Sequence, residues 1–219
     1  MSERDVIIGV TGASGVVYAK ALVAELLSQR LTVHLIPTAH AAVVWRDELG
    51  EPPGVTSAES GAAPVPASQD WIARLEVSPG DADRLVVYDD RDIEAAPASG
   101  TFRARAMVVV PCSMNTLAKI AHGLADTLST RAAGVCLKER RPLVLVPRET
   151  PLSLIDLRNQ VAAAEAGAVV LPAMPGFYNG PASIGDLVHF IVSKICDQLG
   201  LGCSQPIRYG GGGGAPTGG

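Results

Sequence analysis

Residues 108–151 read VVVPCSMNTLAKIAHGLADTLSTRAAGVCLKERRPLVLVPRETP. Two apolar runs in this stretch, VVVP at 108–111 and LVLVP at 143–147, end in proline and are followed by small polar or charged residues. Short runs of this kind predict buried strands. Because ligands of an open parallel sheet lie beyond the carboxyl ends of its strands, the stretch predicts the floor and walls of one binding site.

Basic residues gather in the same stretch although the whole chain has a net charge of -4. They are Arg131, Lys138, Arg140, Arg141 and Arg148. Local positive charge beside strand ends favours an anionic small ligand, with phosphate as the first candidate. The alternative is that the helical members of this set form a solvated helix face.

The rest of the chain alternates strand-like and helix-like patterns. Strands are predicted at 6–10, 32–37, 84–88, 107–111, 143–147 and 168–171. Helices are predicted at 16–30, 39–49, 70–77, 117–123, 125–141, 152–166 and 183–199. Pro151 suits the first turn of its helix. The alternation predicts a single-domain, doubly wound, Rossmann-like α/β fold, with a parallel sheet and helices on both faces.

Length and composition set the domain organisation. With 219 residues, of which 47% are hydrophobic, the chain can bury one full core. We expect one domain over 1–203, in which the Pro- and Ala-rich segment 50–69 is a surface loop. The Gly-rich segment 204–219 is expected to be a disordered tail.

Several function classes are disfavoured by composition. No run of 18 apolar residues and no signal peptide is found, which predicts a cytoplasmic protein without a membrane partner. An aromatic content of 4% and the negative net charge argue against nucleic acid. The four cysteines show no C-x-x-C spacing, which argues against a zinc site or a disulfide framework. Among them Cys203 is the thiol expected to react most readily.

The turn after the first strand reads Thr11-Gly12-Ala13-Ser14-Gly15. At a junction of strand and helix, free backbone N–H groups can hold a phosphate, and glycines allow close approach. The pattern is neither G-x-G-x-x-G nor a Walker loop, so neither a dinucleotide nor a nucleoside triphosphate is indicated. The alternative is a plain turn in which Ser14 caps the helix.

Two further strand ends carry candidate ligands. Ser113, with Met114, Asn115 and Thr116, opens a helix whose N–H groups and hydroxyls could bind phosphate oxygens, although capping alone would explain the serine. Cys112 is expected to be a small buried group. Arg148 offers a fork of donors and Glu149 a carboxylate for proton exchange. A structural ion pair between these two residues is the alternative.

Five motifs occur in order along the chain: GVTGASGVVYA, PASGTF, the 111–152 segment, PAMPGFY and DLVHFIVSKI. As a set they resemble the UbiX-type flavin prenyltransferases. The resemblance runs from about residue 7 to 201 and is weakest between 50 and 92. It implies an enzyme that joins the dimethylallyl group of dimethylallyl monophosphate to N5 and C6 of reduced FMN, without a metal, giving prenylated FMN.

The resemblance also assigns roles to residues. It implies catalytic roles for Ser14, Glu48 and Glu149. The implied flavin ligands are Gly12, Ala13, Ser14, Thr38, Ser113, Met114, Asn115, Thr116 and Arg148. The implied ligands of the prenyl phosphate are Arg131, Lys138, Tyr178 and Lys194. Taken without the resemblance, Glu48 is equally an exposed carboxylate, Tyr178 a packed side chain and Lys194 a surface lysine.

Family context implies a homo-oligomer, a dodecamer with sites where three subunits meet, and a UbiD-type decarboxylase as recipient of the product. One departure is Ile93, where relatives often carry an aromatic residue. His34 and His40 are expected to be packed or exposed histidines without a catalytic role. Two other functions stay open: a flavin-dependent cysteine decarboxylase, which typically has a PASANT-like stretch where this chain has PCSMNT, and a flavin carrier without chemistry.

Overall fold

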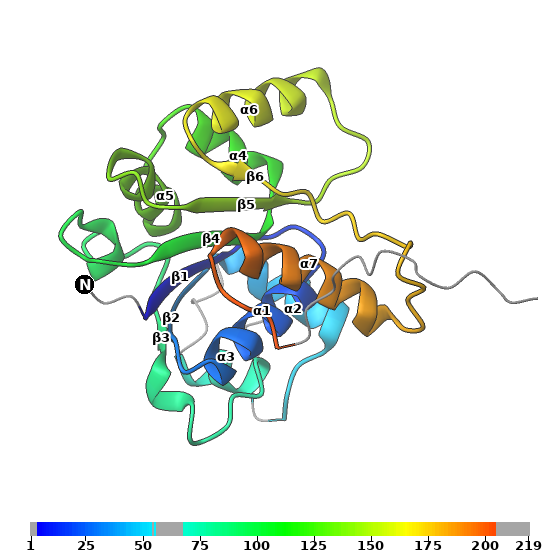
Figure 1. Cartoon of the computed structure of the whole chain (residues 1–219). Coiled ribbons are helices and arrows are strands. Elements are labelled where there is room, and N and C mark those ends of the chain that lie inside the picture. The colour runs from blue at the N-terminus through cyan, green and yellow to red at the C-terminus, as the bar shows by residue number, and fades with distance from the viewer. Residues whose placement is uncertain (1–3, 54, 56–67, 205–219) are drawn as a thin grey trace, which may run out of the picture.

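The computed structural model describes residues 4–53, 55 and 68–204. Its centre is one six-stranded sheet in the order β3-β2-β1-β4-β5-β6 (Figure 1). Every neighbouring pair of strands is parallel. The strands β1 to β6 are, in order, Asp5–Val10, Thr32–Pro37, Leu85–Val87, Ala106–Cys112, Leu143–Pro147 and Val169–Val170. The predicted doubly wound parallel sheet is therefore confirmed.

Helices cover both faces of the sheet (Figure 1). One face carries α1 (Val16–Ser28), α2 (Ala39–Leu49), α3 (Ser68–Arg74) and α7 (Ile184–Gln198). The other face carries α4 (Met114–Ala121), α5 (Leu128–Lys138) and α6 (Leu154–Glu165). Short 3₁₀ turns lie at Ala82–Arg84 and Ala96–Ala98. Because helices cover both faces of the sheet, a ligand can reach the sheet at the ends of its strands.

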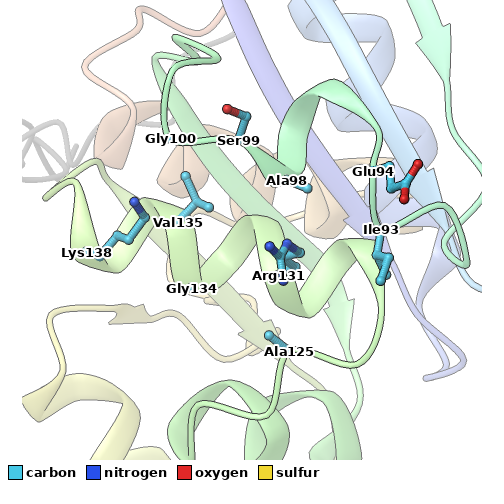
Figure 2. A pocket seen from close by; sticks show the side chains of 10 residues that line it. All are labelled: Ile93, Glu94, Ala98, Ser99, Gly100, Ala125, Arg131, Gly134, Val135 and Lys138. Carbon is cyan, nitrogen blue, oxygen red and sulfur yellow. The ribbon is translucent and has the colours of Figure 1, made fainter.

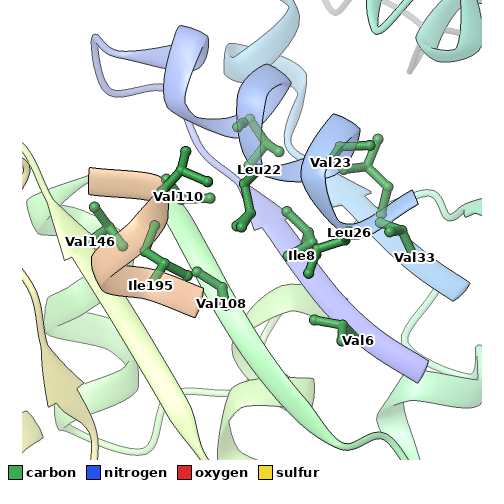
Figure 3. Close-up of a cluster of buried hydrophobic side chains, with 14 of the residues drawn as sticks. Val6, Ile8, Leu22, Val23, Leu26, Val33, Val108, Val110, Val146 and Ile195 are labelled. Atoms are coloured by element: carbon green, nitrogen blue, oxygen red, sulfur yellow. The ribbon is translucent and has the colours of Figure 1, made fainter. Parts of the chain in front are cut away.

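Alternate residues of the central strands feed the two halves of the core. Val6 and Ile8 of β1 pack with α1 and α7 on one face, as Figure 3 shows, while Ile7 belongs to the cluster on the other face. All three side chains are almost fully buried. Each such side chain contributes about 1.5–3 kcal/mol of hydrophobic free energy. A strand apolar on both faces is typical of a sheet covered by helices on both sides.

The strand order places a topological switch point between β1 and β4. From β1 the chain proceeds to β2 and β3 on one side, and β4, β5 and β6 continue the sheet on the other. Connections that leave adjacent strands in opposite directions open a crevice outside their carboxyl ends. The segments that follow β1 and β4, beginning at Thr11 and at Ser113, meet at this crevice.

Several predicted boundaries were wrong for reasons of capping. The helix α6 does not begin at Pro151 but at Leu154, because Ser153 and Asp156 form a reciprocal capping box. The helix α5 begins at Leu128, not at residue 125, because Thr127 caps it. At its other end α5 stops at Lys138 and does not reach Arg141.

The predicted loop and tail fall largely outside the described residues. Of the 50–69 loop, its last residues already belong to α3, which ends at Arg74 and not at residue 77. Ser204 was assigned to the disordered tail, yet its backbone N–H donates to the Glu25 carboxylate at 2.7 Å. Within the described ranges, none of the helices has the length and apolar content required to cross a bilayer.

Candidate functional site

A buried threonine joins the ends of β1 and β4. The Thr11 hydroxyl donates to the Pro111 carbonyl at 2.7 Å and accepts from the Ser113 N–H at 2.8 Å. The Thr11 N–H also donates to the Pro111 carbonyl, at 3.3 Å. These bonds fix the two strand-end turns relative to each other. Thr11 was part of the predicted 11–15 turn, but no role could be predicted for it. The sequence does not show which distant residue a hydroxyl in a turn will contact.

Arg148 brings the end of β5 to the same crevice. Its Nε donates to the Ser14 carbonyl oxygen at 3.3 Å. The predicted convergence of Ser14, Ser113 and Arg148 is thus found in the fold. Tyr18, which the sequence did not single out, also lies in this neighbourhood: burial raises the pKa of its hydroxyl, and the positive charge of Arg148 partly opposes that rise.

Glu48 occupies the amino-terminal end of α1. Its carboxylate accepts hydrogen bonds from the Gly15 N–H at 2.9 and 3.0 Å and from the Val16 N–H at 3.1 Å. A carboxylate here is favoured by the positive end of the helix dipole. Glu48 is therefore more than an exposed surface carboxylate, and it holds the N–H groups that the sequence suggested for phosphate.

The alternative of Ser14 as the cap of α1 is wrong. Gly15 is the N-cap residue, and it makes no side-chain capping bond. Its φ of 105° lies in the left-handed region that glycine adopts without strain. Ser14 is only half-buried, and with its carbonyl engaged by Arg148 its hydroxyl remains available for other contacts.

Gly12 allows the start of α2 to pack against the first turn. A Cβ at this position would lie 2.5 Å from the His40 Cβ. Glycine is therefore needed at this position for the packing of α2, whether or not a ligand also approaches the turn. Thr38 caps α2, accepting from the Ala41 N–H at 3.2 Å, and its own N–H donates to the Val10 carbonyl at 2.9 Å. Thr38 thus lies at the same sheet edge.

The amino-terminal turn of α4 lies directly after β4. Ser113 is its N-cap, and its Oγ accepts from the Thr116 N–H at 3.3 Å and lies 3.0 Å from the Thr116 Oγ1. Met114 and Asn115 lie in the first turn of α4, where backbone N–H groups have no acceptor within the helix. These N–H groups can therefore bind an anion. Asn115 is exposed. Burial raises the pKa of the neighbouring Cys112 thiol, in keeping with a small buried group.

Arg148 and Glu149 line a small hollow of about 60 Å³ with Thr150 and the 172–174 segment. The Glu149 carboxylate is exposed and accepts from the Thr150 N–H at 3.1 Å. Among the described residues no ion pair joins Arg148 to Glu149, so the alternative of a structural ion pair between them is wrong. Both charged groups remain available to a ligand.

A larger hollow of about 590 Å³ lies between α5 and the 93–100 segment (Figure 2). Arg131 and Lys138 project into it from one face of α5, as their spacing predicted. Ile93 and Ser99 line the opposite wall. A Cβ on Gly100 would lie 2.9 Å from the Lys138 Nζ, so glycine lets this lysine lie against the backbone.

Two other cations of the basic stretch have different positions. Arg141 holds the 100–102 segment, donating to the carbonyls of Gly100 at 2.7 Å and Phe102 at 2.5 Å. Arg140 is exposed just after α5, with a φ of 54°. Arg141 is therefore a structural residue of the wall. Arg131 and Lys138 are also exposed, and the Lys138 Nζ lies 2.8 Å from the Glu139 carboxylate, so the solvated-face interpretation stays open for the helical cations.

Tyr178 and Lys194 come together over Phe190. The Tyr178 ring meets the Phe190 ring edge to face at 5.9 Å between centroids, and the Lys194 Nζ lies 5.9 Å from the Phe190 centroid. Phe190 also lines a hollow of about 270 Å³ with residues 176 and 179–182. Tyr178 is 62% exposed, so its ring presents a face to the surroundings.

One expectation is not met within a single chain. The stretch 108–151 was predicted to wall one site, but Arg131 and Lys138 line a different hollow from Arg148 and Glu149. The fold turns α5 away because it packs its buried side, including Leu128 and Ala132, against one face of the sheet. Of the predicted phosphate ligands, Arg131 and Lys138 thus line one hollow, whereas Tyr178 and Lys194 lie beside Phe190, which lines another.

His34 has a structural environment, as expected. It is buried in β2, its Nδ1 lies 2.9 Å from the Tyr88 hydroxyl, and its Nε2 lies 3.5 Å from the Asp5 carboxylate. Burial lowers the pKa of the imidazole, and the nearby Asp5 carboxylate opposes this. His34 therefore packs inside the sheet and does not face the crevice at Thr11.

The chain is similar to known proteins over most of its length. A family model described as Flavoprotein matches residues 1–196. A flavin prenyltransferase UbiX from Synechocystis sp. is 42% identical over 210 residues, which cover 95% of this chain and 97% of that protein. The flavin prenyltransferase UbiX of Deinococcus radiodurans is 44% identical over 195 residues, covering 89% of this chain and 88% of that protein.

Solved structures give the same result. AnUbiX in complex with FMN and dimethylallyl pyrophosphate superposes with a TM-score of 0.79 at 35% identity, covering 95% of this chain and 98% of that one. A dodecameric FMN-dependent UbiX-like decarboxylase from Escherichia coli O157:H7 gives 0.78 at 37% identity, covering 94% and 100%. The FMN-dependent cysteine decarboxylase SpaF, at 18% identity and 0.54, shares the fold alone.

Proposed function

The chain belongs to the UbiX-type flavin prenyltransferase family of flavoproteins, and from this premise we propose that it transfers the dimethylallyl group of dimethylallyl monophosphate to N5 and C6 of reduced FMN. The observation that carries the proposal is the crevice at the switch point. There Thr11 joins the turns after β1 and β4, and Arg148 joins Ser14.

The residues at the crevice fit a flavin mononucleotide. The first turn of α4 offers the N–H groups of Met114 and Asn115 to the phosphate, with the Thr116 hydroxyl beside them. The end of α1 is engaged by Glu48, so the phosphate takes the α4 end. The turn that contains Gly12, Ala13 and Ser14, together with Thr38 and Arg148, would hold the isoalloxazine ring.

Reduced FMN, when bound, supplies the electron-rich N5 and C6 positions. The chain supplies the environment for the prenyl phosphate. The carbon–oxygen bond of that substrate breaks with its electron pair leaving on phosphate, and cationic groups stabilise this developing charge. We assign this role to Arg131, Lys138, Tyr178 and Lys194.

Two protons would leave the flavin, one from N5 and one from C6, as the new bonds form. One can go to the departing phosphate, and the other is balanced by the proton that the prenyl double bond takes up when it is consumed in bonding to C6. Glu149, which is exposed beside Arg148, can pass a proton to the departing phosphate. Ser14 and Glu48 lie at the turn expected beside the ring and assist proton movement near N5. Glu48 is held in place by two backbone N–H donors, so its carboxylate is preorganised for this task.

A second copy of the chain completes the site in this proposal. Within one copy, Arg131 and Lys138 line one hollow, whereas Tyr178 and Lys194 lie beside Phe190 at another. In this proposal they meet around one substrate because neighbouring copies contribute to the same site. Apolar side chains suited to such contacts are exposed on α6 and near Tyr178: Leu154, Ile155, Leu157, Val161, Met174, Phe177 and Ile184. We therefore propose a homo-oligomer, of the dodecameric kind described for the Escherichia coli relative.

The product, prenylated FMN, has no evident use within this chain, so we propose a UbiD-type decarboxylase as its recipient.

The cysteine decarboxylase alternative is not favoured, because those enzymes share only the fold. The carrier alternative is separated by experiment. A carrier needs no charged group such as Glu149 at a second hollow next to the flavin crevice.

The test is anaerobic incubation of the protein with reduced FMN and dimethylallyl monophosphate, followed by mass spectrometry of the released flavin. We expect a flavin heavier by one five-carbon prenyl unit. In Glu149→Gln we expect FMN binding to persist while the rate of product formation falls by about 10²-fold or more. An unmodified flavin with the native protein would overturn the proposed activity, and equal rates for both proteins would remove Glu149 from it.

A further inference from the structure

A second cluster of reactive groups lies at the far end of α1. Glu25 sits in the last turns of this helix and is only 7% exposed. A buried carboxylate requires partners, and here Oε1 accepts from the Gln29 Nε2 at 2.6 Å and the Ser204 N–H at 2.7 Å. Among the partners that the described residues provide, Oε2 accepts from the Ser204 hydroxyl alone. Each carboxylate oxygen accepts two bonds, so Oε2 keeps one free lone pair.

Two thiols face this carboxylate. Cys196 is fully buried on α7, and Cys203 is half-buried in the segment that follows α7. The ligand atoms of Glu25, Cys196 and Cys203 all lie within 4.8 Å of one another. Ligand atoms around a tetrahedral Zn²⁺ are about 3.5–3.8 Å apart, so each pair of ligand atoms needs to close by at most about 1.3 Å.

The chemistry of the cluster favours a cation. One carboxylate and two thiols, all anionic when ionised, are held together in a poorly solvated position. Ionising them together there without a counter-charge carries a large free-energy penalty. A bound divalent ion reverses this penalty, because it stabilises the thiolates and the carboxylate at once. Two sulfur ligands select a soft ion such as Zn²⁺ over Mg²⁺ or Ca²⁺.

The surrounding hydrogen bonds hold the donors in position. Gln29 donates to the Gly202 carbonyl at 2.7 Å, and Arg105 donates to the carbonyls of Leu199 and Gly200, both at 3.1 Å. These bonds fix the chain on the approach to Cys203. The bonds from Gln29 and Ser204 also orient the Glu25 carboxylate, as outer-shell partners do at metal sites.

We propose that Glu25, Cys196 and Cys203 bind one Zn²⁺ that fastens the C-terminal segment to α1 and α7. Three protein ligands leave the fourth position to water. Because α1 runs back from the crevice, its last turn lies toward the opposite edge of the sheet from Ser14 and Arg148. The metal is structural and takes no part in prenyl transfer. The absence of C-x-x-C spacing concealed the site, because one ligand is 171 residues away from the nearer cysteine.

The test uses Co²⁺ as a spectroscopic probe on the full chain, after reduction and removal of metals by a chelator. We expect thiolate-to-cobalt absorption that saturates at one ion per chain and disappears when Zn²⁺ is added. Cys203→Ser should weaken Co²⁺ binding by more than about tenfold. Cys136→Ser is the matched control: its thiol is buried in α5, away from the cluster, and its binding should be unchanged.

Circular dichroism of each variant shows whether it is folded, and Glu25→Gln gives a second variant that keeps the shape of the side chain. Absence of cobalt–thiolate absorption in the reduced native protein would overturn the proposal. So would equal Co²⁺ affinity in the native protein and in Cys203→Ser. Formation of a Cys196–Cys203 disulfide in air, with no metal bound after reduction, would likewise overturn it.

Discussion

The hydroxyl of Thr11 is the most informative single group to remove. It is 1% exposed and forms two bonds of 2.7 and 2.8 Å that connect the turns after β1 and β4. Thr11→Val keeps the branched shape and deletes the hydroxyl. The Pro111 carbonyl still accepts the Thr11 backbone N–H at 3.3 Å, whereas the Ser113 N–H is left without its partner.

The size of the effect follows from these contacts. An unsatisfied buried donor costs about 1–3 kcal/mol, and the lost bond to Pro111 adds about 0.5–1.5 kcal/mol. We therefore expect the free energy of unfolding to fall by about 1.5–4.5 kcal/mol. The Ser113 N–H also sets the direction of α4, whose first turn is the proposed phosphate site. FMN affinity should fall as well, by about tenfold for each 1.4 kcal/mol of lost binding energy.

The assay is urea denaturation together with an FMN titration followed by quenching of flavin fluorescence. Thr11→Ser is the matched control, because it keeps the hydroxyl and loses only a methyl group. It should retain most of the stability and of the FMN affinity. A Thr11→Val protein within about 0.5 kcal/mol of the native protein, with unchanged FMN affinity, would refute the role assigned to this joint.

Three further predictions concern other parts of the molecule. Glu48→Gln should lower the free energy of unfolding by about 0.5–1 kcal/mol, measured by urea denaturation, because it removes a negative charge from the start of α1; an unchanged value would contradict the assigned contact. The pKa of His34 is lowered by burial, so the unfolded chain takes up the proton first and stability should decrease as the pH falls below about 6.5. In His34→Gln this decrease should be smaller, and identical pH profiles from denaturation would exclude His34 as its source. Arg131→Ala and Arg148→Ala should each be inactive in prenyl transfer, and after dissociation and joint reassembly the mixture should regain activity; a mixture as inactive as its components would argue against a site shared between copies.

Much of the fold could be predicted because the strands are short apolar runs bounded by turn residues. The residues after β1, β4 and β5 could also be predicted to converge, since the carboxyl ends of parallel strands share one edge. Ser14 and Arg148 are an example, joined by a hydrogen bond across 134 positions. Periodicity likewise placed Arg131 and Lys138 on one face of α5.

The features that could not be predicted depend on tertiary geometry. Nothing in the sequence near Glu48 indicates that its carboxylate binds N–H groups 32 and 33 positions earlier. The separation of Lys138 from Arg148 depends on which face of the sheet α5 covers. The start of α6, in contrast, had a visible signal: Ser153 and Asp156 have the spacing of a capping box, and the proline at 151 was given too much weight.

The central claim is that one flavin mononucleotide binds at the switch point between β1 and β4. The most direct test is a crystal structure of the protein with reduced FMN and the prenyl phosphate. The account predicts the flavin phosphate at the N–H groups of Met114 and Asn115, with the ring beside Ser14 and Arg148. A flavin bound in the hollow between α5 and the 93–100 segment, with the crevice at Thr11 left to solvent, would contradict it.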